Sequence, residues 1–444
     1  MASAAEQLAA NLNFSALAKA DELKKRIWFT LGALLVYRLG TYIPLPGIDP
    51  SVWTQVFRSQ SGGILGMFNM FSGGGIDRMA IFALNIMPYI SASIILQLLT
   101  TVSPSLEALK KEGEAGRKVI NQYTRYLTLF LALAQAYGIA VGLQGAGNVV
   151  STPGPFFLIS TALTLTGGTM FLMWLGEQVT SRGIGNGISL IIMAGIVAEL
   201  PSALANMLEL GRQGALSTGI ILIVIIMAVA VIAFIVFMER AQRRLLIQYP
   251  KRQVGNKMMQ GDSSHLPLKL NTSGVIPPIF ASSLLLLPAT VTSFAAQGNA
   301  PGWLQYTAAL LGRGQPLYLI IYAGLIIFFT FFYTAIVFSP TDTADNLKRS
   351  GGFIPGIRPG ERTAAHIDYV LTRISLVGAI YLTVVCLIPE MLHSELNVSQ
   401  FIGGTSLLIM VTVTLDTISQ VQSHLIAQQY EGLVKRSRLG GRRR

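Results

Sequence analysis

The chain has 444 residues, of which 52% are hydrophobic and only 12% are charged, and its formal net charge is +12. Soluble globular chains carry about 25% charged residues, so this composition excludes a water-soluble domain and indicates an integral membrane protein. The single cysteine, Cys386, excludes an intrachain disulfide and the cysteine pairs of structural metal sites. It lies in an apolar run, where we interpret it as core filler.

Residues 1–26 precede the first apolar run. They lack the basic, apolar and small-residue order of a cleaved signal peptide. Leu8, Leu12, Phe14 and Leu17, with polar residues between them, fit a short amphipathic helix at the membrane interface. A disordered tail fits the same residues, and both interpretations stay open.

Ten apolar runs approach the length of about 20 residues that a helix needs to cross a bilayer. The tenth becomes polar toward its end, so we expect its helix to continue into water. We divide the spans into two five-helix halves, residues 27–206 and 207–424. The expected spans are 27–45, 77–102, 120–142, 155–176, 184–206, 216–238, 270–291, 316–339, 368–390 and 399–424.

The basic residues predict the orientation. Ten spans place both termini on one side, and if that side is cytoplasmic, all but five of the 33 Lys and Arg residues are cytoplasmic. This asymmetry follows the positive-inside rule and places residues 1–26 and the basic tail 425–444 in the cytoplasm. The five exceptions are Arg38, Arg58, Arg78, Arg212 and Arg313.

The stretch SGGILGMFNMFSGGG, residues 61–75, lies between the first two spans, on the outer side by the charge count. Its middle is apolar enough to be buried. It is nevertheless too short and too rich in glycine to span a bilayer. The simplest interpretation is a structural loop outside the membrane. This interpretation does not explain why the centre of the segment is apolar.

Spans two and seven each carry proline in an apolar segment, IMPYI at 86–90 and IPPIF at 276–280. Each is the second helix of its half. Interrupted segments in matching positions are typical of inverted-repeat membrane folds, which form a pathway where the halves meet. The sequence therefore predicts an all-α polytopic fold of ten transmembrane helices in two pseudo-symmetric, inverted halves.

No catalytic or metal-binding constellation is visible in the sequence. The four histidines are dispersed, and the Gly-x-Ser-x-Gly pattern is missing. GIGNG at 183–187 opens a membrane helix rather than following a strand, which disfavours a nucleotide site. We therefore expect no catalytic residues, no cofactor and no metal. A membrane enzyme is the least favoured alternative.

A secondary transporter of small solutes is the main rival. Such transporters bury ionisable residues near the bilayer midplane, whereas these spans contain almost none. Arg38, Glu177 and Asp416 lie near span ends, where they can pair or snorkel. The other polar residues of the spans suit hydrogen bonds between helices, and they include Ser91, Ser93, Gln97, Asn271, Thr272, Ser282 and Ser283.

Two expected cytoplasmic loops, 239–269 and 340–367, are long and basic. A charge run is ordinarily a solvated face. The segment GGFIPGIRPG, however, surrounds an arginine with backbone-restricting Gly and Pro, which favours presentation of that side chain to a partner. An acidic or nucleic-acid-rich partner fits this charge.

Several long segments resemble the SecY family, the main subunit of the bacterial Sec protein-conducting channel. The resemblance extends from about residue 22 to about residue 436. One departure is Asn85, where the family pattern before IMP commonly has glycine, and this affects the expected packing near the pore. The matching segments are FNMFSGGG, FALNIMPYISASIILQLLT, QYTRY, FLMWLGEQVTSRGIGNGIS, HLPLKLN, SGVIPPIFASS, TADNLKRSGGFIPGIRPGERTA and FIGGTSLLI.

The resemblance implies that the two halves form a clamshell around an hourglass pore. A ring of aliphatic side chains would close its waist. Such a ring fits around any passing residue without binding it tightly, and when empty it excludes hydrated ions by dewetting. By motif position, the ring would be Ile86, Ile90, Ile188, Ile192, Ile279 and Ile409.

The same resemblance implies that residues 61–75 are a plug beneath the ring. The plug residues would be Ile64, Leu65, Met67, Phe68, Asn69, Met70 and Phe71. Glycine adopts backbone angles that other residues avoid, so glycines at both ends would act as hinges. These hinges would be Gly62, Gly63, Gly73, Gly74 and Gly75.

A lateral gate is implied between spans two and three of one half and spans seven and eight of the other. Signal sequences would open it toward lipid. Its polar residues would be Ser91, Gln97, Asn271, Ser282 and Ser283.

The basic loops resemble docking sites for the ribosome, including its RNA, and for the SecA ATPase. Other implied partners are the small membrane subunits SecE and SecG, signal peptides, translocating polypeptides and membrane lipids. The expected location is the bacterial inner membrane. The docking residues would be Arg243, Arg244, Lys251, Arg252, Lys348, Arg349 and Arg358.

Overall fold

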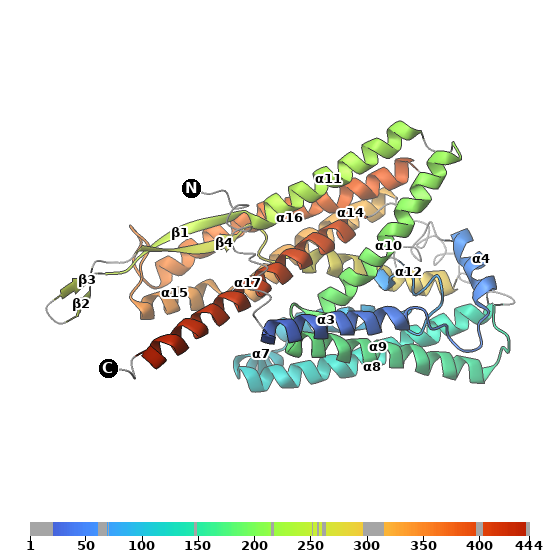
Figure 1. The fold of residues 1–444 in the computed structure, drawn as a ribbon, viewed down its shortest axis with the longest axis horizontal. Helices are drawn as coiled ribbons and strands as arrows, with labels where there is room; N and C mark the ends of the chain where they lie inside the picture. Colours follow the sequence, from blue (N-terminus) through green and yellow to red (C-terminus); the bar gives the residue numbers. More distant parts are fainter. Residues whose placement is uncertain are drawn as a thin grey trace. The chain divides into compact units, whose positions relative to one another are not determined.

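The computed structural model describes residues 21–60, 69, 71–145, 149–214, 217–250, 252–254, 257–259, 263–295, 315–396 and 403–440. Each of the ten predicted spans contains a helix (Figure 1). The last of them continues to Gly440, so the prediction that it extends beyond its apolar part is confirmed. These helices are α3 (Asp21–Gly40), α6 (Met87–Val102), α8 (Glu114–Gly145), α9 (Pro155–Arg182), α10 (Gly187–Arg212), α11 (Thr218–Arg240), α12 (Ile276–Ala295), α14 (Pro316–Val337), α16 (Glu361–Leu396) and α17 (Gly404–Gly440).

In the described part of the chain, three shorter helices lie between them: α4 (Pro50–Gln60), α7 (Pro104–Lys111) and α15 (Pro340–Ser350). Proline occupies the first turn of several helices, including α6, α7, α9, α14 and α15. A proline suits this position because its missing N–H would have no partner there and its fixed φ fits a helix. The chain bends by 98° between α6 and α7, where Pro104 follows the end of α6.

Among the described residues, seven helices are long and apolar enough to cross a membrane, or eight if the bent pair α6 and α7 forms one span. The helix α3 fails this test because charged residues crowd its first two turns. Within α12, Ile276–Leu285 is a further, shorter apolar helix.

The second predicted span starts later than expected, at Met87 instead of residue 77. The residues before it form turns rather than helix, and Met79 and Asn85 have positive φ values of 45° and 48°. A helix cannot pass through residues in the left-handed region. Apolar composition predicted a helix here because turns buried inside a protein are as apolar as spans.

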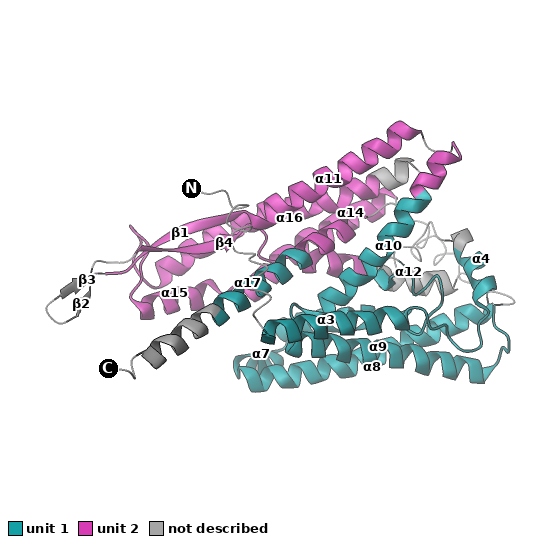
Figure 2. Ribbon diagram, in the orientation of Figure 1, with its two compact units in different colours: residues 1–206, 287–309, 413–444 teal, residues 207–286, 310–412 magenta. Residues whose placement is uncertain are grey.

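The contacts of the chain divide it into two compact units (Figure 2). Unit 1 comprises residues 1–206, 287–309 and 413–444, and unit 2 comprises residues 207–286 and 310–412. The predicted boundaries of the halves, 27–206 and 207–424, stay predictions.

In unit 1, α8 packs against α9 and α6, and its buried residues form a stripe of small side chains. A spacing of four residues keeps the stripe on one helix face, and small residues let helix backbones approach closely. The buried members on α8 are Thr124, Thr128, Ala132, Ala136 and Ala140.

In unit 2, α14 and α16 pack together, and much of α11 is exposed. Exposed Leu222, Ile223, Ile226, Val229 and Phe237 cover the α11 surface. An apolar surface of this extent indicates contact with lipid, because its exposure to water would be unfavourable.

The basic segment after α11 folds into a β-hairpin instead of an irregular loop. Its strands β1 (Gln242–Gln248) and β4 (Ser263–Lys269) pair antiparallel, with Gln242 opposite Lys269. A second short pair, β2 (Arg252–Val254) and β3 (Lys257–Met259), extends it. The fold is thus helical with two small antiparallel ribbons, which the prediction of an all-α fold omitted.

Candidate functional site

The residues before α6 form a buried turn, and side chains of neighbouring elements bind its backbone. We call residues 71–79 the clamped turn. The hydroxyl of Tyr37 on α3 donates to the carbonyl of Ser72 at 3.2 Å. The guanidinium of Arg38 donates to the carbonyl of Gly73 at 2.6 Å. Both donors come from one helix and bind consecutive carbonyls.

Two further side chains hold the clamped turn from other directions. The indole N–H of Trp53 on α4 donates to the carbonyl of Ile76 at 2.6 Å. The side-chain amide of Asn85 donates to the carbonyl of Phe71. A buried carbonyl that loses its partner costs about 1–3 kcal/mol, so these contacts fix the backbone of the turn strongly.

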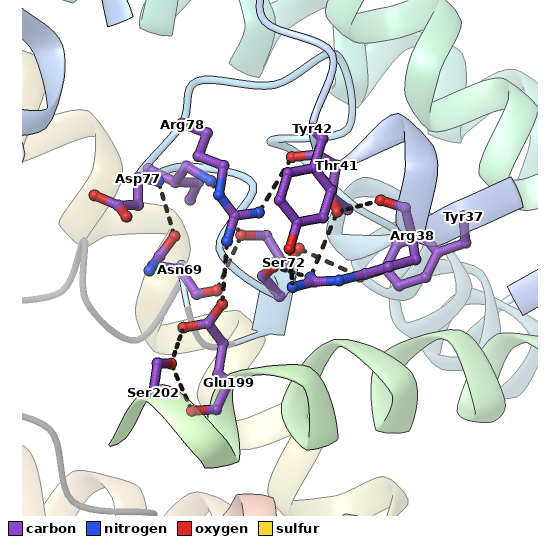
Figure 3. A network of polar contacts seen from close by, with 12 residues as sticks. Tyr37, Arg38, Thr41, Tyr42, Asn69, Ser72, Asp77, Arg78, Glu199 and Ser202 are labelled. Atoms are coloured by element: carbon purple, nitrogen blue, oxygen red, sulfur yellow. Dashed lines mark hydrogen bonds and ion pairs between the residues drawn. The ribbon is translucent and has the colours of Figure 1, made fainter. Parts of the chain in front are cut away.

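An arginine cluster lies beside the clamped turn (Figure 3). Arg78 lies 3.9 Å from Glu199 of α10, and its guanidinium stacks over the ring of Tyr42 at 4.2 Å. Arg38 also lies over this ring, at 4.9 Å, and donates to the Tyr42 hydroxyl at 3.0 Å. Arg78 also donates to the carbonyl of Thr41 at 3.5 Å. Two of the five exceptions to the positive-inside rule are thus engaged in one contact network.

Asn69 closes the other side of this network (Figure 3). Its side-chain oxygen accepts from the Asp77 amide at 2.8 Å, and its carbonyl accepts from the Ser72 hydroxyl and the Gly74 amide, both at 3.0 Å. The two ends of the turn are therefore tied together through one residue.

The helix α4, which carries Trp53, is fixed at its start by Asp49. The Asp49 carboxylate accepts from the hydroxyl of Ser51 at 2.6 Å and from its amide at 2.9 Å. These hydrogen bonds, led by that of the hydroxyl, hold the pKa of the Asp49 carboxyl below its ordinary value. The carboxylate thus satisfies an amide at the N-terminus of α4.

The predicted plug lies only partly within the described residues. Asn69 and Phe71 belong to the network above, and Gly73, Gly74 and Gly75 are buried in the clamped turn. The plug prediction itself stays a prediction. Its other residues, Gly62, Gly63, Ile64, Leu65, Met67, Phe68 and Met70, lie outside the described residues.

The six predicted ring isoleucines divide between the two units. In unit 1, Ile86 and Ile90 are one turn apart at the start of α6, and Ile188 and Ile192 are one turn apart on α10. Each pair therefore lies on one helix face. Unit 2 holds Ile279 on α12 and Ile409 on α17. All except the half-buried Ile188 are buried.

The predicted gate residues also divide between the units. In unit 1, Ser91 is buried and Gln97 donates to the hydroxyl of Ser93 at 3.3 Å. In unit 2, the Ser282 hydroxyl donates to a carbonyl of its own helix at 2.9 Å. The buried Ser283 hydroxyl has no hydrogen-bond partner among the described residues.

Asn271, the fifth gate residue, belongs to a polar cluster inside unit 2. Its amide donates to the carboxylate of Glu239, at the end of α11, at 2.6 Å and to the carbonyl of Gly274 at 3.0 Å. Its oxygen accepts from Ser273 at 3.0 Å. The Tyr381 hydroxyl of α16 lies 3.4 Å from the same carboxylate. This cluster ties the segment before α12 to α11 and α16.

The two basic segments form one structure in unit 2, which we call the basic platform. It consists of β1, β4, α15, residues 351–360 and the first turns of α16. Strand alternation turns Leu245 and Ile247 inward. The apolar core beneath the platform comprises Leu245, Leu268, Ile354, Ile367, Val370 and Ile374.

The arginine-bearing segment of the platform has a fixed backbone. Phe353 and Gln248 exchange two backbone hydrogen bonds, at 2.9 and 3.0 Å, which attach this segment to β1. The helix α15 ends at Gly351 with φ of 74°, a conformation that favours glycine. The Thr363 hydroxyl donates to the carbonyl of Arg358 at 3.0 Å.

Six of the seven predicted docking residues lie on this platform or its extension. Arg252 belongs to β2, and Lys251 lies outside the described residues. The remaining five are all exposed: Arg243, Arg244, Lys348, Arg349 and Arg358.

The sequence patterns did not single out the residues that clamp the turn or tie Asn271. These residues are Tyr37, Trp53, Glu199, Glu239 and Tyr381. Most of their contacts join positions more than 20 residues apart, which no local pattern shows. One signal was visible: Arg38 and Arg78 violated the positive-inside rule, and a charge on the disfavoured side often has a specific partner.

The fold and its exposed apolar helices define a multi-span membrane protein, and similar solved structures define its architecture. A structure described as a protein conducting channel matches with a TM-score of 0.63 at 18% identity, covering 90% of this chain and 92% of that one. Sec61 in a canine ribosome-channel complex matches with a TM-score of 0.61 at 18% identity, covering the same shares. The fold class predicted from the sequence is thereby confirmed.

The particular family follows from the sequence comparisons. A family model described as SecY matches residues 80–418. Protein translocase subunit SecY of Vibrio cholerae is 54% identical, covering 96% of this chain and 97% of the relative. The subunit of the same name from Escherichia coli K12 is 55% identical, covering 95% and 96%. The chain belongs to the SecY family, as the resemblance predicted.

Proposed function

We propose that this chain is the central subunit of a protein-conducting channel in the bacterial inner membrane. It moves unfolded secretory proteins across the bilayer and releases transmembrane segments sideways into it. The observation that carries the proposal is the similarity, over 95% of the chain or more, to proteins named protein translocase subunit SecY. The channel performs no covalent chemistry, so the driving force comes from a partner.

The isoleucine ring is the proposed seal of the pore. Its support is that isoleucines recur one turn apart at the start of α6 and on α10, on one face of each helix. A ring of such side chains deforms around a passing polypeptide and dewets when empty. The segment around Ile64 to Phe71 plugs the pore from the outer side.

The lateral gate is proposed along α6 and α8 of one half and α12 and α14 of the other. Polar contacts between membrane helices are worth about 0.6–2 kcal/mol. A signal helix gains roughly 0.3–0.6 kcal/mol from each central Leu or Ile that enters lipid. Several such residues outweigh the gate contacts, so a signal helix can open it.

The basic platform is the proposed docking surface for a ribosome and for a SecA-type motor, on the cytoplasmic side with both termini. Its exposed arginines and fixed backbone support this role. Sec61 and the yeast Ssh1 complex, whose structures share the fold, are described as bound to ribosomes. SecE and SecG are the proposed small membrane partners.

Translocation into vesicles tests the proposal directly. The chain is co-reconstituted with SecE- and SecG-type subunits, and a secretory precursor and a SecA-type ATPase are added. We expect ATP-dependent protection of the precursor from protease, as with the E. coli relative reconstituted in parallel. A chain that assembles normally and yields no protected precursor, while the relative succeeds, would refute the function.

A disulfide across the gate tests the lateral opening. Ser91→Cys and Ser283→Cys are combined and oxidised, with each single variant as a control. We expect the crosslinked channel to lose secretion and the oxidised single variants to keep it. Secretion that persists after complete crosslinking rules out this gate.

A further inference from the structure

The segment GIGNG, residues 183–187, joins α9 to α10, and we call it the glycine turn. Two of its buried amides are bound by side chains from distant parts of the chain. The Ile184 amide donates to the hydroxyl of Thr30 on α3 at 3.1 Å. The Gly185 amide donates to the side-chain oxygen of Gln420 on α17 at 2.9 Å. The turn is therefore tied to two other helices, and all of these residues belong to unit 1.

A third acceptor comes from α9. The Gly187 amide donates to the Thr180 hydroxyl at 2.9 Å, and this hydroxyl donates in turn to the Gly176 carbonyl at 2.9 Å. Thr30 has the same arrangement, because its hydroxyl donates to the Arg26 carbonyl of its own helix at 2.9 Å. Each threonine thus uses its hydrogen within its own helix and offers a lone pair to the turn.

The glycines of this region bring the start of α10 directly against α9. A Cβ on Gly187 would collide with the carbonyl oxygen of Gly176. A Cβ on Gly176 would lie 3.0 Å from Cγ1 of Ile188, so the Ile188 side chain lies against α9. Gly185 has a φ of 86°, a left-handed value that favours glycine. Close packing and hydrogen bonds therefore both fix the beginning of α10.

The glycine turn passes into α10 through Asn186. The Asn186 side-chain oxygen accepts from the amides of Ile188 at 3.1 Å and Ser189 at 3.5 Å, as expected of a helix cap. Free amides at a helix start can bind an anion. Here side chains of the protein itself bind them, so this glycine-rich segment serves as a joint between helices.

We propose that Thr30, Thr180 and Gln420 are positioning residues that set the α10 part of the isoleucine ring through the glycine turn. This inference rests on the proposed seal. Ile188 and Ile192 follow the turn by one and five residues. Because a helix continues the direction of its first turn, a change in tilt or rotation there moves both side chains. The ring excludes ions only while its side chains stay together, so the loss of these acceptors loosens the seal.

The ion leak of idle vesicles tests this positioning. Thr30→Val and Thr180→Val keep the branched shape of the side chain and remove the acceptor, whereas Thr30→Ser and Thr180→Ser keep the hydroxyl. We expect each valine variant to speed the decay of a membrane potential several-fold, and each serine variant to stay within two-fold of the unchanged chain.

The matched control is Thr128→Val. It removes a buried hydroxyl of α8 that donates to the Thr124 carbonyl of its own helix at 2.7 Å. This variant should not raise the leak. Valine variants of Thr30 and Thr180 that leak no more than this control would refute the inference.

Cysteine reactivity separates the positioning of α10 from a general loosening of unit 1. Cys386, the only cysteine of the chain, is changed to Ser, and a single cysteine replaces Ile192 on α10 or Leu165 on α9, both of which are buried. When Thr30→Val is added, we expect maleimide labelling at position 192 to rise several-fold and labelling at position 165 to stay within two-fold. A parallel rise at both positions would overturn the positioning role.

Ile192→Asn is the reference for the ring itself. If this variant leaks and the valine variants do not, the proposed seal stands and the positioning role alone is refuted. If Ile192→Asn does not leak, the proposed seal fails, and the inference fails with it.

Discussion

The clamped turn and the basic platform are both built around arginines, and they use them in opposite ways. In the turn, Arg38 and Arg78 contact a carbonyl, a carboxylate and an aromatic ring of the protein itself. On the platform, Arg243 and Arg358 are exposed above an apolar core. There the backbone is fixed by strand pairing and by buried Leu and Ile side chains, so the arginine side chains are not needed to hold it in place.

We expect the difference to separate arginines that stabilise the protein from arginines that meet the proposed partner. An internal arginine contributes to the position of its neighbours, and its loss disturbs the seal. An arginine displayed on a preorganised backbone contributes to binding, and its loss slows association. Charge substitutions in the two regions should therefore affect different properties of the channel.

The largest effect is expected from reversing the charge of Arg358. Arg358→Glu replaces attraction to an acidic or RNA surface by repulsion, which costs several kcal/mol at an interface. We expect the rate of ATP-dependent translocation to fall at least about ten-fold, since about 1.4 kcal/mol already gives that factor. Ion permeability of idle vesicles should not change.

Lys118→Glu, an equal charge reversal on α8 outside the platform, is the matched control and should translocate normally. Undiminished translocation by the Arg358 variant would show that this arginine is not part of the docking surface. It would also contradict the distinction between arginines of the turn and arginines of the platform.

A smaller effect is expected from polar substitutions in the ring. Ile90→Asn or Ile279→Asn hydrates the proposed constriction and weakens its dewetting barrier. We expect a several-fold rise in the ion leak of idle vesicles, measured as the decay of a membrane potential. The control is Ile223→Asn, which places the same residue on the exposed face of α11. Equal leaks from ring and control variants would contradict the assignment of the ring.

A charge swap probes the clamped turn. Glu199→Arg sets like charges together in a partly exposed pair, where an ion pair is worth about 0–1 kcal/mol. We expect about a three-fold rise in idle leak and nearly normal docking. The double variant Arg78→Glu with Glu199→Arg restores a pair of opposite charges and should therefore recover part of the seal. The recovery should be incomplete because the stacking of Arg78 on Tyr42 is lost. No recovery at all would show that the pairing of opposite charges is irrelevant.

The smallest effect is expected at Asn85. Asn85→Gly keeps the positive φ accessible and removes only the amide that binds the Phe71 carbonyl. The net loss is about 1 kcal/mol. We expect about a two-fold rise in leak, and a larger rise for Asn85→Ala, which adds backbone strain. An alanine variant with a smaller ion leak than the glycine variant would contradict the claim that alanine strains the backbone at this position.

Hydrophobic length predicted the helical spans well, because every span must satisfy its backbone internally and face lipid. It failed at residues 77–86, where buried turns are as apolar as a helix. The hairpin was missed because exposed basic residues conceal the alternation of Leu245 and Ile247. Asn85 departs from the family's usual glycine, and its φ of 48° explains why glycine suits this position.

The candidate site was predicted more unevenly. Motif resemblance predicted the ring isoleucines and the docking arginines of the platform, and most of them lie within a long matching segment, although Ile192, Arg243 and Arg244 do not. The contacts of the clamped turn were not predicted because their acceptors are backbone carbonyls. Every residue has a backbone carbonyl, so the sequence does not show which ones are bound. Tyr37 and Trp53 read as ordinary apolar residues until the structure shows their donors bound to the turn.

Photo-crosslinking of a stalled secretory chain tests the channel most directly. A photoreactive residue is placed at successive positions of a precursor that is arrested during translocation in vesicles. We expect adducts with α6, α10, α12 and α17, near Ile90, Ile192, Ile279 and Ile409, from whichever position occupies the pore. Adducts confined to lipid, or to the exposed face of α11, would contradict a path through this chain.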